Sequence, residues 1–220
     1  MRGVFVTGTD TNIGKTVVSA ALLCRYRGAA PIKYWKPIQT GTEHSDDTAE
    51  VRRLAACSAT EIVDEGFRFA PAVSPHLAAQ LTGERIDIGM LTALVASQPP
   101  TDRWIVEGAG GVLVPLNESE LMIDLIVGLD LPVVIVARSG LGTINHTLLT
   151  LEVLRARLVR IAGLVMVGVA DAENRLAIER YGVVRVLGEL PMLARLDPRP
   201  LERWARTSLD PEGRLMEFLG

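Results

Sequence analysis

The sequence predicts an α/β protein in which one parallel sheet is flanked by helices, and three observations support this prediction. Short runs rich in β-branched residues alternate with amphipathic stretches along the 220 residues, which is the pattern of βαβ units. Some of these runs are apolar throughout, as in strands that helices cover on both faces. The composition, 48% hydrophobic and 22% charged, is that of an ordinary globular chain, and we expect a single domain over residues 1–220.

The first elements follow from apolar runs and from the residues that interrupt them. Val4–Thr7 is an apolar run before a small-residue turn and is expected to be a strand, with a helix after it over Gly14–Tyr26. A second strand is expected at Ile32–Trp35. Pro37 ends it, because proline disfavours helical backbone in the residue before it. A helix is then expected over Asp46–Cys57, since Ser and Asp at its start are good capping residues.

The middle of the chain is less regular. Residues 60–100 form an irregular section with short helices near 75–82 and 87–97. Trp104–Glu107 is expected to be a strand, because an apolar run ends there in a carboxylate and a glycine-rich turn. Val133–Ala137 is apolar at every position and is therefore expected to be a strand buried on both faces.

The last third of the chain continues the alternation. Thr143–Leu158 has an apolar side at helical spacing and is expected to be a helix. Ile161–Val169 and Val183–Leu187 are expected to be strands, with a helix near 172–181 between them. Short helices are expected to close the chain. Because crossovers between parallel strands are right-handed, the carboxyl ends of the strands share one edge, and open α/β sheets bind ligands there.

Composition argues against several function classes. The net charge of −3 disfavours a nucleic-acid-binding protein, which needs a basic face to release counterions. The longest apolar runs, near 131–137 and 161–170, are shorter than the ~18 residues of a membrane-spanning helix, and the apolar start is too short for a secretory signal. Cys24 and Cys57 have neither metal-site nor redox spacing, which favours two reduced, buried thiols of a cytoplasmic protein.

Lysine is scarce in this chain and is confined to its beginning. Twenty arginines accompany three lysines, Lys15, Lys33 and Lys36. One interpretation is codon bias, because a GC-rich genome prefers arginine, and composition by itself favours it, because most lysines are surface residues. The functional alternative is that a lysine remains where the bulky planar guanidinium of arginine cannot replace a compact ammonium. Lys33 is interpreted as structural.

A phosphate-binding loop is predicted between the first strand and the first helix. Its sequence is Gly8-Thr9-Asp10-Thr11-Asn12-Ile13-Gly14-Lys15-Thr16. In such a loop backbone N–H groups and a helix N-terminus face phosphate, the lysine reaches the β- and γ-phosphates, and the hydroxyl that follows binds Mg²⁺. Thr9 stands where the strict motif has glycine, so the match is to a longer variant. The structural alternative is a strand–turn–helix connection that uses Gly14 only for its conformation and caps the helix with Thr11 or Asn12.

Lys36 is the second candidate cation. It follows the second strand, so we expect it at the carboxyl edge of the sheet near the phosphate loop, where a cation stabilises a transferring phosphoryl group. The Lys36-Pro37 pair by itself favours a solvated loop lysine.

Two acidic segments are candidate magnesium ligands. Asp46 and Asp47 precede a helix, where capping is the commoner role for aspartate. Glu107 ends an apolar strand before Gly108, and a strand-terminal acid beside a phosphate loop is the Walker-B arrangement that holds Mg²⁺. A structural glutamate is the alternative, although buried unpaired carboxylates are costly.

The ordered set of motifs GTDTNIGKT, WKPIQTG, SDD, VEGAGG, GTINHTLLT and GELPML resembles the dethiobiotin synthetase family over about residues 3–193. The resemblance implies a P-loop NTPase fold of the nitrogenase-iron-protein-like type and a homodimer. It also implies a ligase of biotin biosynthesis that closes the ring of dethiobiotin from 7,8-diaminononanoate, CO₂ or bicarbonate, and MgATP. A carbamate forms first, its oxygen attacks the γ-phosphate, and the second amine displaces phosphate from the mixed anhydride.

The resemblance assigns roles residue by residue. Lys15 and Lys36 match the catalytic lysines. The implied nucleotide-binding residues are Thr11, Asn12, Ile13, Gly14, Lys15, Thr16, Val17, Asp47, Glu107, Gly108, Ala109, Gly110, Pro191, Met192 and Leu193. The implied substrate-binding residues are Thr11, Lys36, Thr40 and, from the neighbouring subunit, Leu141, Gly142, Thr143 and Asn145. The implied magnesium ligands are Thr16, Asp47 and Glu107, with Asp47 preferred to Asp46 because its distance to the following Ala-Glu-Val fits the family pattern better.

Two of these assignments carry a qualification. A helix N-terminus after Leu141 attracts an anion such as the substrate carboxylate, whereas from the residues alone Thr143 is better interpreted as a plain N-cap. Val167 stands where many family members carry an asparagine that reads adenine, so we expect a nucleotide pocket that accepts other nucleoside triphosphates beside ATP.

Other functions fit a phosphate loop as well. The first alternative is a regulatory or partitioning ATPase, but such proteins carry a lysine where Asp10 stands and do not need the Lys36-Pro37 motif. The second is a non-catalytic nucleotide-binding subunit. This alternative is disfavoured because the chain keeps the charged residue at every position where the family motifs have one. A guanine-specific Asn-Lys-x-Asp motif is excluded after residue 36, because no lysine follows that position.

Overall fold

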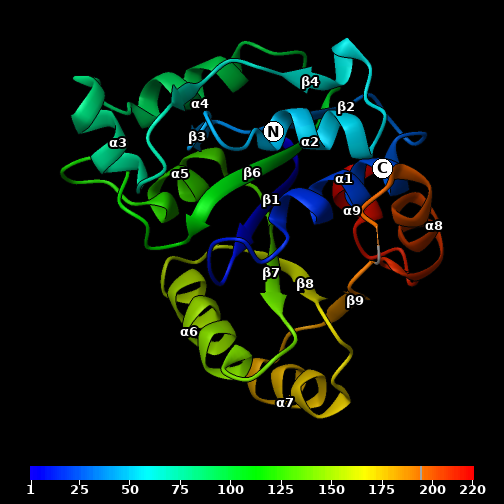
Figure 1. Ribbon diagram of the computed structural model, residues 1–220. Coiled ribbons are helices and arrows are strands. Elements are labelled where there is room, and N and C mark those ends of the chain that lie inside the picture. Colours follow the sequence, from blue (N-terminus) through cyan, green and yellow to red (C-terminus); the bar gives the residue numbers. More distant parts are fainter. Residues whose placement is uncertain (194) are drawn as a thin grey trace.

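The computed structural model describes residues 1–193 and 195–220. Within these residues seven parallel strands form the main sheet (Figure 1). Their spatial order is β4 (Ile62–Val63), β2 (Ile32–Trp35), β6 (Arg103–Gly111), β1 (Arg2–Gly8), β7 (Val133–Arg138), β8 (Ile161–Val167) and β9 (Val186–Leu190). A small parallel ribbon joins β3 (Ile38–Thr40) to β5 (Phe67–Phe69).

Helices connect these strands or follow the last of them. They are α1 (Lys15–Tyr26), α2 (Asp47–Leu54), the 3₁₀ helix η1 (Ala59–Glu61), α3 (Pro75–Thr82), α4 (Ile88–Ala96), α5 (Met122–Leu129), α6 (Thr143–Ala156), α7 (Ala172–Gly182), α8 (Pro198–Ser208) and α9 (Met216–Leu219). In the described part of the chain no helix has both the length and the apolar composition needed to cross a bilayer.

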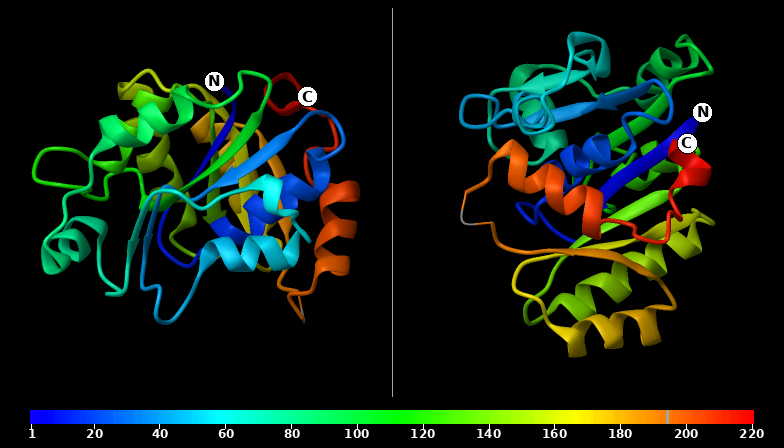
Figure 2. Two further views of the ribbon diagram at one scale, coloured as in Figure 1. Left: turned by 90° about the horizontal axis from the view of Figure 1, so that it is seen from above. Right: turned by 90° about the vertical axis from the view of Figure 1, so that its right-hand side faces the viewer.

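Both faces of the main sheet are covered by helices (Figure 2). Helices α1, α2, α8 and α9 pack on one face, and α3 to α7 contribute to the core on the other. Alternate residues of β1 enter the two cores, Val4 and Val6 on the α1 side and Phe5 on the opposite side. This two-sided burial explains why the strands are apolar at consecutive positions.

The strand order creates a topological switch point at the centre of the sheet. β1 lies between β6 and β7. The chain leaves β1 through α1 toward β2 on one side, and it reaches β7 on the other side from β6 through α5. The direction of winding therefore changes at β1, and α/β sheets bind ligands beyond the carboxyl ends of the strands at such a point.

Strands β2 and β6 pair in register, with Tyr34 opposite Ile105 and Trp35 opposite Val106. Trp35 and Trp104 pack edge to face beneath them, with ring centroids 6.1 Å apart, a contact worth about 1 kcal/mol beyond the area it buries. These contacts hold rigid the two strands that lead to Lys36 and carry Glu107.

Several predicted element boundaries are corrected. Helix α2 ends at Leu54, three residues before the predicted end, and β8 ends at Val167 instead of Val169. The predicted strand Val183–Leu187 is wrong at both ends, because β9 spans Val186–Leu190. Val183 takes a left-handed backbone conformation with φ of 43° at the end of α7, so the chain must turn before the strand begins.

The structure also contains elements that the sequence does not predict, and it places some residues differently. The short strands β3, β4 and β5 and the helix α5 were not predicted. Strand β6 continues to Gly111, so Glu107 lies within the strand instead of ending it. Both cysteines are free thiols in the described chain, but only Cys24 is buried, and Cys57 is half-buried at the end of α2.

Candidate functional site

The phosphate loop occupies the connection from β1 to α1, at the centre of the sheet. Gly14 caps α1 in a left-handed conformation with φ of 100°, which glycine adopts without strain. A Cβ at Gly14 would lie 3.2 Å from the side chain of Val167. The Nζ of Lys15 folds back over the loop and donates to the carbonyl of Asp10 at 3.0 Å. The loop therefore curls around its own lysine, which is largely buried.

Glu107 is the centre of a buried polar cluster beside this loop. Its Oε1 accepts from the Thr16 hydroxyl at 3.0 Å and from Lys36 Nζ at 2.8 Å. Its Oε2 accepts from the Tyr34 hydroxyl at 3.0 Å. The side chain is 0% exposed, and a buried carboxylate needs such donors to offset its loss of hydration.

Lys36 lies at the carboxyl end of β2, next to the phosphate loop. Its Nζ lies 2.6 Å from a carboxylate oxygen of Asp47 and donates to the carbonyl of Gly108 at 3.1 Å. The residue is 3% exposed, so it is not the solvated loop lysine of the structural alternative. Lys33 instead donates to the carbonyl of Thr60 at 2.6 Å at the surface, as a structural lysine does.

The two aspartates at the start of α2 have different positions. Asp46 is the N-cap, and its Oδ1 accepts from the backbone N–H of Ala49 at 3.0 Å. Asp47 is the first residue of the helix and turns toward Lys36. One aspartate thus caps the helix and the other lies in the charged cluster.

The close packing of charges shifts their pKa values. Burial, together with the nearby charge of Lys36, lowers the pKa of Lys15 to about 8. Burial would also lower the pKa of Lys36, but Glu107 and Asp47 more than offset it and hold that pKa above its ordinary value. Burial would raise the pKa of Asp47, but Lys36 outweighs it and the pKa is lowered. The cluster therefore holds Lys36 as a cation and Asp47 as an anion.

A cleft of about 350 Å³ opens onto these side chains. Its lining residues are Thr11, Asn12, Gly14, Lys15, Thr16, Val17, Lys36, Gln39, Thr40, Ser45, Asp47, Ala109 and Gly110. Glu107 lies behind this surface and reaches it through Thr16 and Lys36. The cleft thus brings together most of the nucleotide-binding and substrate-binding residues predicted between Thr11 and Gly110.

A wider cavity of about 620 Å³ continues from the other side of the loop. It shares Thr11, Asn12, Gly14 and Val17 with the first cleft, and its further lining residues are Ile13, Arg138, Val167, Leu190, Pro191, Met192, Leu193 and Leu196. The predicted base-binding residues after β9 therefore lie next to the phosphate loop, in mostly apolar surroundings.

The segment that opens α6 lies apart from this cleft. Leu141, Gly142, Thr143 and Asn145 do not line it within the described residues of one chain. Gly142 is the N-cap of α6, with φ of 90°, and Thr143 is the first helical residue, so the interpretation of Thr143 as a plain N-cap is wrong. The side chain of Leu141 is fully exposed.

The donor set of the cleft suits magnesium. Thr16, Asp47 and Glu107 supply hydroxyl and carboxylate oxygens, the hard ligands that Mg²⁺ prefers. Across residues 1–193 and 195–220, no group of three or more His, Cys, Asp or Glu side chains is arranged to hold a metal ion. A magnesium ion here would also need oxygen ligands from a bound phosphate, as is usual for this ion.

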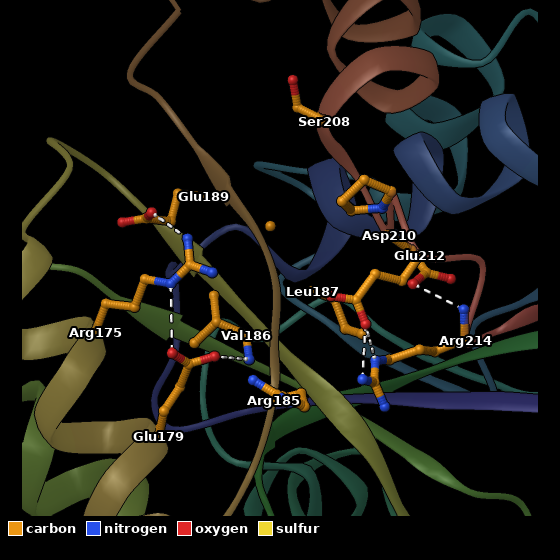
Figure 3. Close-up of a pocket in the computed structure, with 12 residues that line it drawn as sticks. Arg175, Glu179, Arg185, Val186, Leu187, Glu189, Ser208, Asp210, Glu212 and Arg214 are labelled. Carbon is orange, nitrogen blue, oxygen red and sulfur yellow. Dashed lines mark hydrogen bonds and ion pairs between the residues drawn. The ribbon is translucent and has the colours of Figure 1, made fainter.

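A further cavity, of about 290 Å³, lies between α7, β9 and the segment after α8 (Figure 3). Arg175 lies 2.9 Å from Glu189 and 3.7 Å from Glu179, and Arg214 lies 2.7 Å from Glu212. Carboxylates therefore pair with Arg175 and Arg214 at this cavity.

Sequence reasoning missed Tyr34, Gln39 and Ser45. Gln39 and Ser45 line the cleft and lie within or beside the segments that hold Lys36 and Asp47, so proximity in sequence was the available signal. In the sequence, Tyr34 is indistinguishable from any other buried aromatic residue of a strand. Its bond to Glu107 depends on the pairing of β2 with β6, for which the sequence carries no signal.

Comparisons with known proteins give relatives over most of the chain. A family model described as an AAA domain matches residues 2–200. The chain is 52% identical over 193 residues to the ATP-dependent dethiobiotin synthetase of Paramagnetospirillum magneticum, covering 88% of this chain and 89% of the relative. It is 41% identical over 217 residues to the enzyme of that name from Rhodopseudomonas palustris, covering 99% of this chain and 97% of the relative.

Solved structures show the same fold. The MinC:MinD cell division protein complex of Aquifex aeolicus matches with a TM-score of 0.62 at 12% identity, covering 99% of this chain and 96% of the other. A ParA family ATPase of Chlorobium tepidum matches with a TM-score of 0.58 at 12% identity, covering 100% of this chain and 98% of the other. These likenesses confirm the predicted P-loop fold and carry no further statement of function. The identities above, over nearly the whole of both chains, place this chain in the ATP-dependent dethiobiotin synthetase family.

Proposed function

We propose that this chain, as one unit over residues 1–220, catalyses the ATP-dependent ring closure of 7,8-diaminononanoate with CO₂ to dethiobiotin. The observation that carries the proposal is the meeting of Lys15, Lys36 and Asp47 in one cleft with the phosphate loop, in a chain of this family. Its use of ATP favours the cytoplasm as its place of action, and no nucleic-acid or membrane partner is part of the proposal.

The proposed reaction has three steps. An amine of the diamine adds to CO₂ and loses a proton, which gives a carbamate. A carbamate oxygen attacks the γ-phosphorus of ATP, and the bond to the bridging oxygen of ADP breaks. The second amine attacks the carbonyl carbon of the resulting carbamic-phosphoric anhydride and expels inorganic phosphate, which closes the ring.

The lysines act at the second step. The ammonium of Lys15 pairs with the γ-phosphate. Lys36 stabilises the carbamate and the negative charge that develops during phosphoryl transfer. Preorganised cations lower the barrier most when they face charge that develops in the transition state. Mg²⁺, held by Thr16, Asp47 and Glu107, would supply neutralisation of the β- and γ-phosphate charge. Thr11 and Thr40 are the substrate contacts of this half of the site.

The second half of the substrate site comes from a partner subunit in this proposal. The exposed Leu141 and the start of α6 lie outside the cleft of their own chain, and the N-terminus of α6 is suited to hold a carboxylate. An apolar hollow of about 510 Å³, lined in part by Leu113, Pro115, Leu149 and Val153, adjoins the phosphate loop and α6. Its composition supports a homodimer formed across this face.

The base of the nucleotide belongs in the wider cavity beside the loop. Val167 lines it in place of an amide side chain, so hydrogen-bonded discrimination between bases is weak there. We expect kcat/KM for ATP to exceed that for CTP and GTP by less than about tenfold. A preference for ATP above that ratio in a panel of nucleoside triphosphates would contradict this part of the proposal.

Phosphate release from MgATP with bicarbonate, measured with and without 7,8-diaminononanoate, tests the main proposal. We expect release only with the diamine, together with dethiobiotin detected by mass spectrometry. Hydrolysis that does not depend on the diamine would favour a switch ATPase. No release under either condition would favour a non-catalytic nucleotide-binding protein.

A further inference from the structure

The two oxygens of the Glu107 carboxylate have different surroundings. Oε1 faces the cleft side, where the Thr16 hydroxyl and Lys36 Nζ donate to it at 3.0 and 2.8 Å. Oε2 faces the interior and accepts from the Tyr34 hydroxyl at 3.0 Å. Glu107 and Tyr34 are both 0% exposed, so this second bond lies wholly inside the protein.

Tyr34 is held rigidly where it makes this bond. It belongs to β2, an interior strand, and its backbone is in register with Ile62 of β4 on one side and Ile105 of β6 on the other. Its ring is part of the hydrophobic core on the α1 face. It does not line the cleft in the part of the chain that the structure describes, so it is not placed to touch a substrate.

The terminal torsion of a glutamate is broad, so packing alone orients its carboxylate weakly. A hydrogen bond from an immobile donor to one oxygen restricts this rotation and thereby directs the other oxygen. In this structure the directed oxygen is Oε1, which points at Thr16. A hydrogen bond to a carboxylate in a dry environment is also stronger than one in water.

We propose that Tyr34 is a positioning residue for the metal site, because its hydroxyl anchors Oε2 of Glu107 and so presents Oε1 to Mg²⁺. The inference rests on the proposed magnesium role of Glu107. It assigns a function to a core tyrosine that touches neither substrate nor metal.

The test compares Tyr34→Phe with Tyr26→Phe. Tyr26 is also buried and also donates its hydroxyl to a buried carboxylate, that of Asp210, but at the C-terminal segment. Both variants keep the ring and lose one such bond. The readouts are the Mg²⁺ concentration for half-maximal ADP binding, measured by calorimetry, and the Tm.

We expect Tyr34→Phe to raise the half-saturating Mg²⁺ concentration about tenfold, the usual effect of losing a hydrogen-bond partner of a metal ligand, and Tyr26→Phe to leave it unchanged. Equal Mg²⁺ dependence in the two variants, with comparable losses of Tm, would show that Tyr34 is only structural and would overturn the inference.

The variant Glu107→Gln tests the premise that Glu107 binds Mg²⁺ separately from the inference about Tyr34. If Glu107→Gln leaves the Mg²⁺ dependence unchanged, both the metal role of Glu107 and the inference fall. If it raises the requirement while Tyr34→Phe does not, only the inference falls. We expect Tyr34→Phe to add nothing in the Glu107→Gln background, since residues that act through one another are not additive.

If Tyr34→Phe does not fold, a measurement on protein that keeps Tyr34 tests the inference instead. The chain has three tyrosines, so ¹⁹F spectra of protein labelled with 3-fluorotyrosine contain three signals, which Tyr26→Phe and Tyr181→Phe assign. We expect the Tyr34 signal to shift when Mg²⁺ is added to the ADP complex. A Tyr34 signal that does not respond to Mg²⁺ would overturn the inference.

Discussion

Lys15 is a buried cation beside a second cation, and its pKa is lowered to about 8 by burial and by Lys36. The charged form therefore costs stability in the folded chain below that pH. The cost is relieved as the pH rises from about 8 toward the ordinary lysine value of 10.5, because the unfolded chain keeps its proton over that range and the folded chain does not. In the proposed function, the γ-phosphate of bound ATP would supply the missing counter-charge.

This predicts proton uptake when nucleotide binds. At pH 8 about half of the free chains lack the Lys15 proton, so binding of ATP should take up about half a proton. The dependence of the calorimetric binding enthalpy on the ionisation enthalpy of the buffer measures this number. Lys33→Met is the matched control and should behave as wild type, whereas the absence of uptake at pH 8 would contradict the assignment.

Lys36 neutralises two carboxylates at once, Asp47 at 2.6 Å and Glu107 at 2.8 Å. Removing it leaves buried negative charge unpaired, which costs roughly 3 kcal/mol. We therefore expect Lys36→Met to abolish turnover and to lower the Tm in EDTA, with Mg²⁺ restoring more stability than it adds to wild type. Thermal unfolding with and without Mg²⁺ checks this, and an unchanged kcat would refute the role.

Lys36→Arg tests shape separately from charge. The site encloses a compact ammonium between two carboxylates and the carbonyl of Gly108, and the planar fork of arginine does not fit the same position. We expect it to lose turnover as well. Wild-type kcat in this variant would show that charge alone suffices.

At the scale of elements, the start of α2 places a helix-capping acid one position before an acid of the charged cluster. Asp46 caps the helix and Asp47 joins the charged cluster. We expect Asp46→Ala to cost ~1 kcal/mol of stability with near-normal activity. Asp47→Asn should instead raise the Mg²⁺ requirement and lower kcat.

Urea unfolding and the Mg²⁺ dependence of turnover measure the two effects in the same pair of variants. The reverse pattern, in which Asp46→Ala loses magnesium dependence and Asp47→Asn loses only stability, would exchange the two roles.

Elements also show where local sequence is insufficient. The run from Val183 is β-branched and apolar, yet its first residue is the exposed, left-handed end of α7. A Cβ at Gly182 would lie 2.7 Å from the side chain of Leu151, so α7 packs closely against α6 where the helix ends, a contact between helices that local sequence does not show. Likewise β3 and β5 pair only with each other, and three-residue strands carry too little periodicity to be recognised.

At the scale of the whole molecule, the proposed site spans two subunits. Lys36 belongs to one chain's cleft and Asn145 to the α6 of the partner in this proposal. A mixture of Lys36→Ala and Asn145→Ala chains should therefore recover activity that neither variant has. In a heterodimer one site carries both changes and the other carries none.

Equal, freely exchanging amounts of the two variants should give about a quarter of wild-type activity, since half of the dimers are mixed and each has one intact site. Activity assays after joint unfolding and refolding measure this recovery. Recovery near zero, with both variants dimeric, would show that each site is complete within one chain.

The sequence by itself determined the fold class, the phosphate loop and the family, because these depend on periodicity and on motifs that are contiguous in the chain. It also marked Lys15 and Lys36 as unusual, since lysine stops at residue 36. Only the tertiary structure decided that Asp46 caps while Asp47 pairs with Lys36, that Glu107 lies within β6, and that Tyr34 donates to it. Those relations form between strands and helices that are neighbours in space, and the order β4-β2-β6-β1 of the sheet, which local sequence does not encode, brings them together.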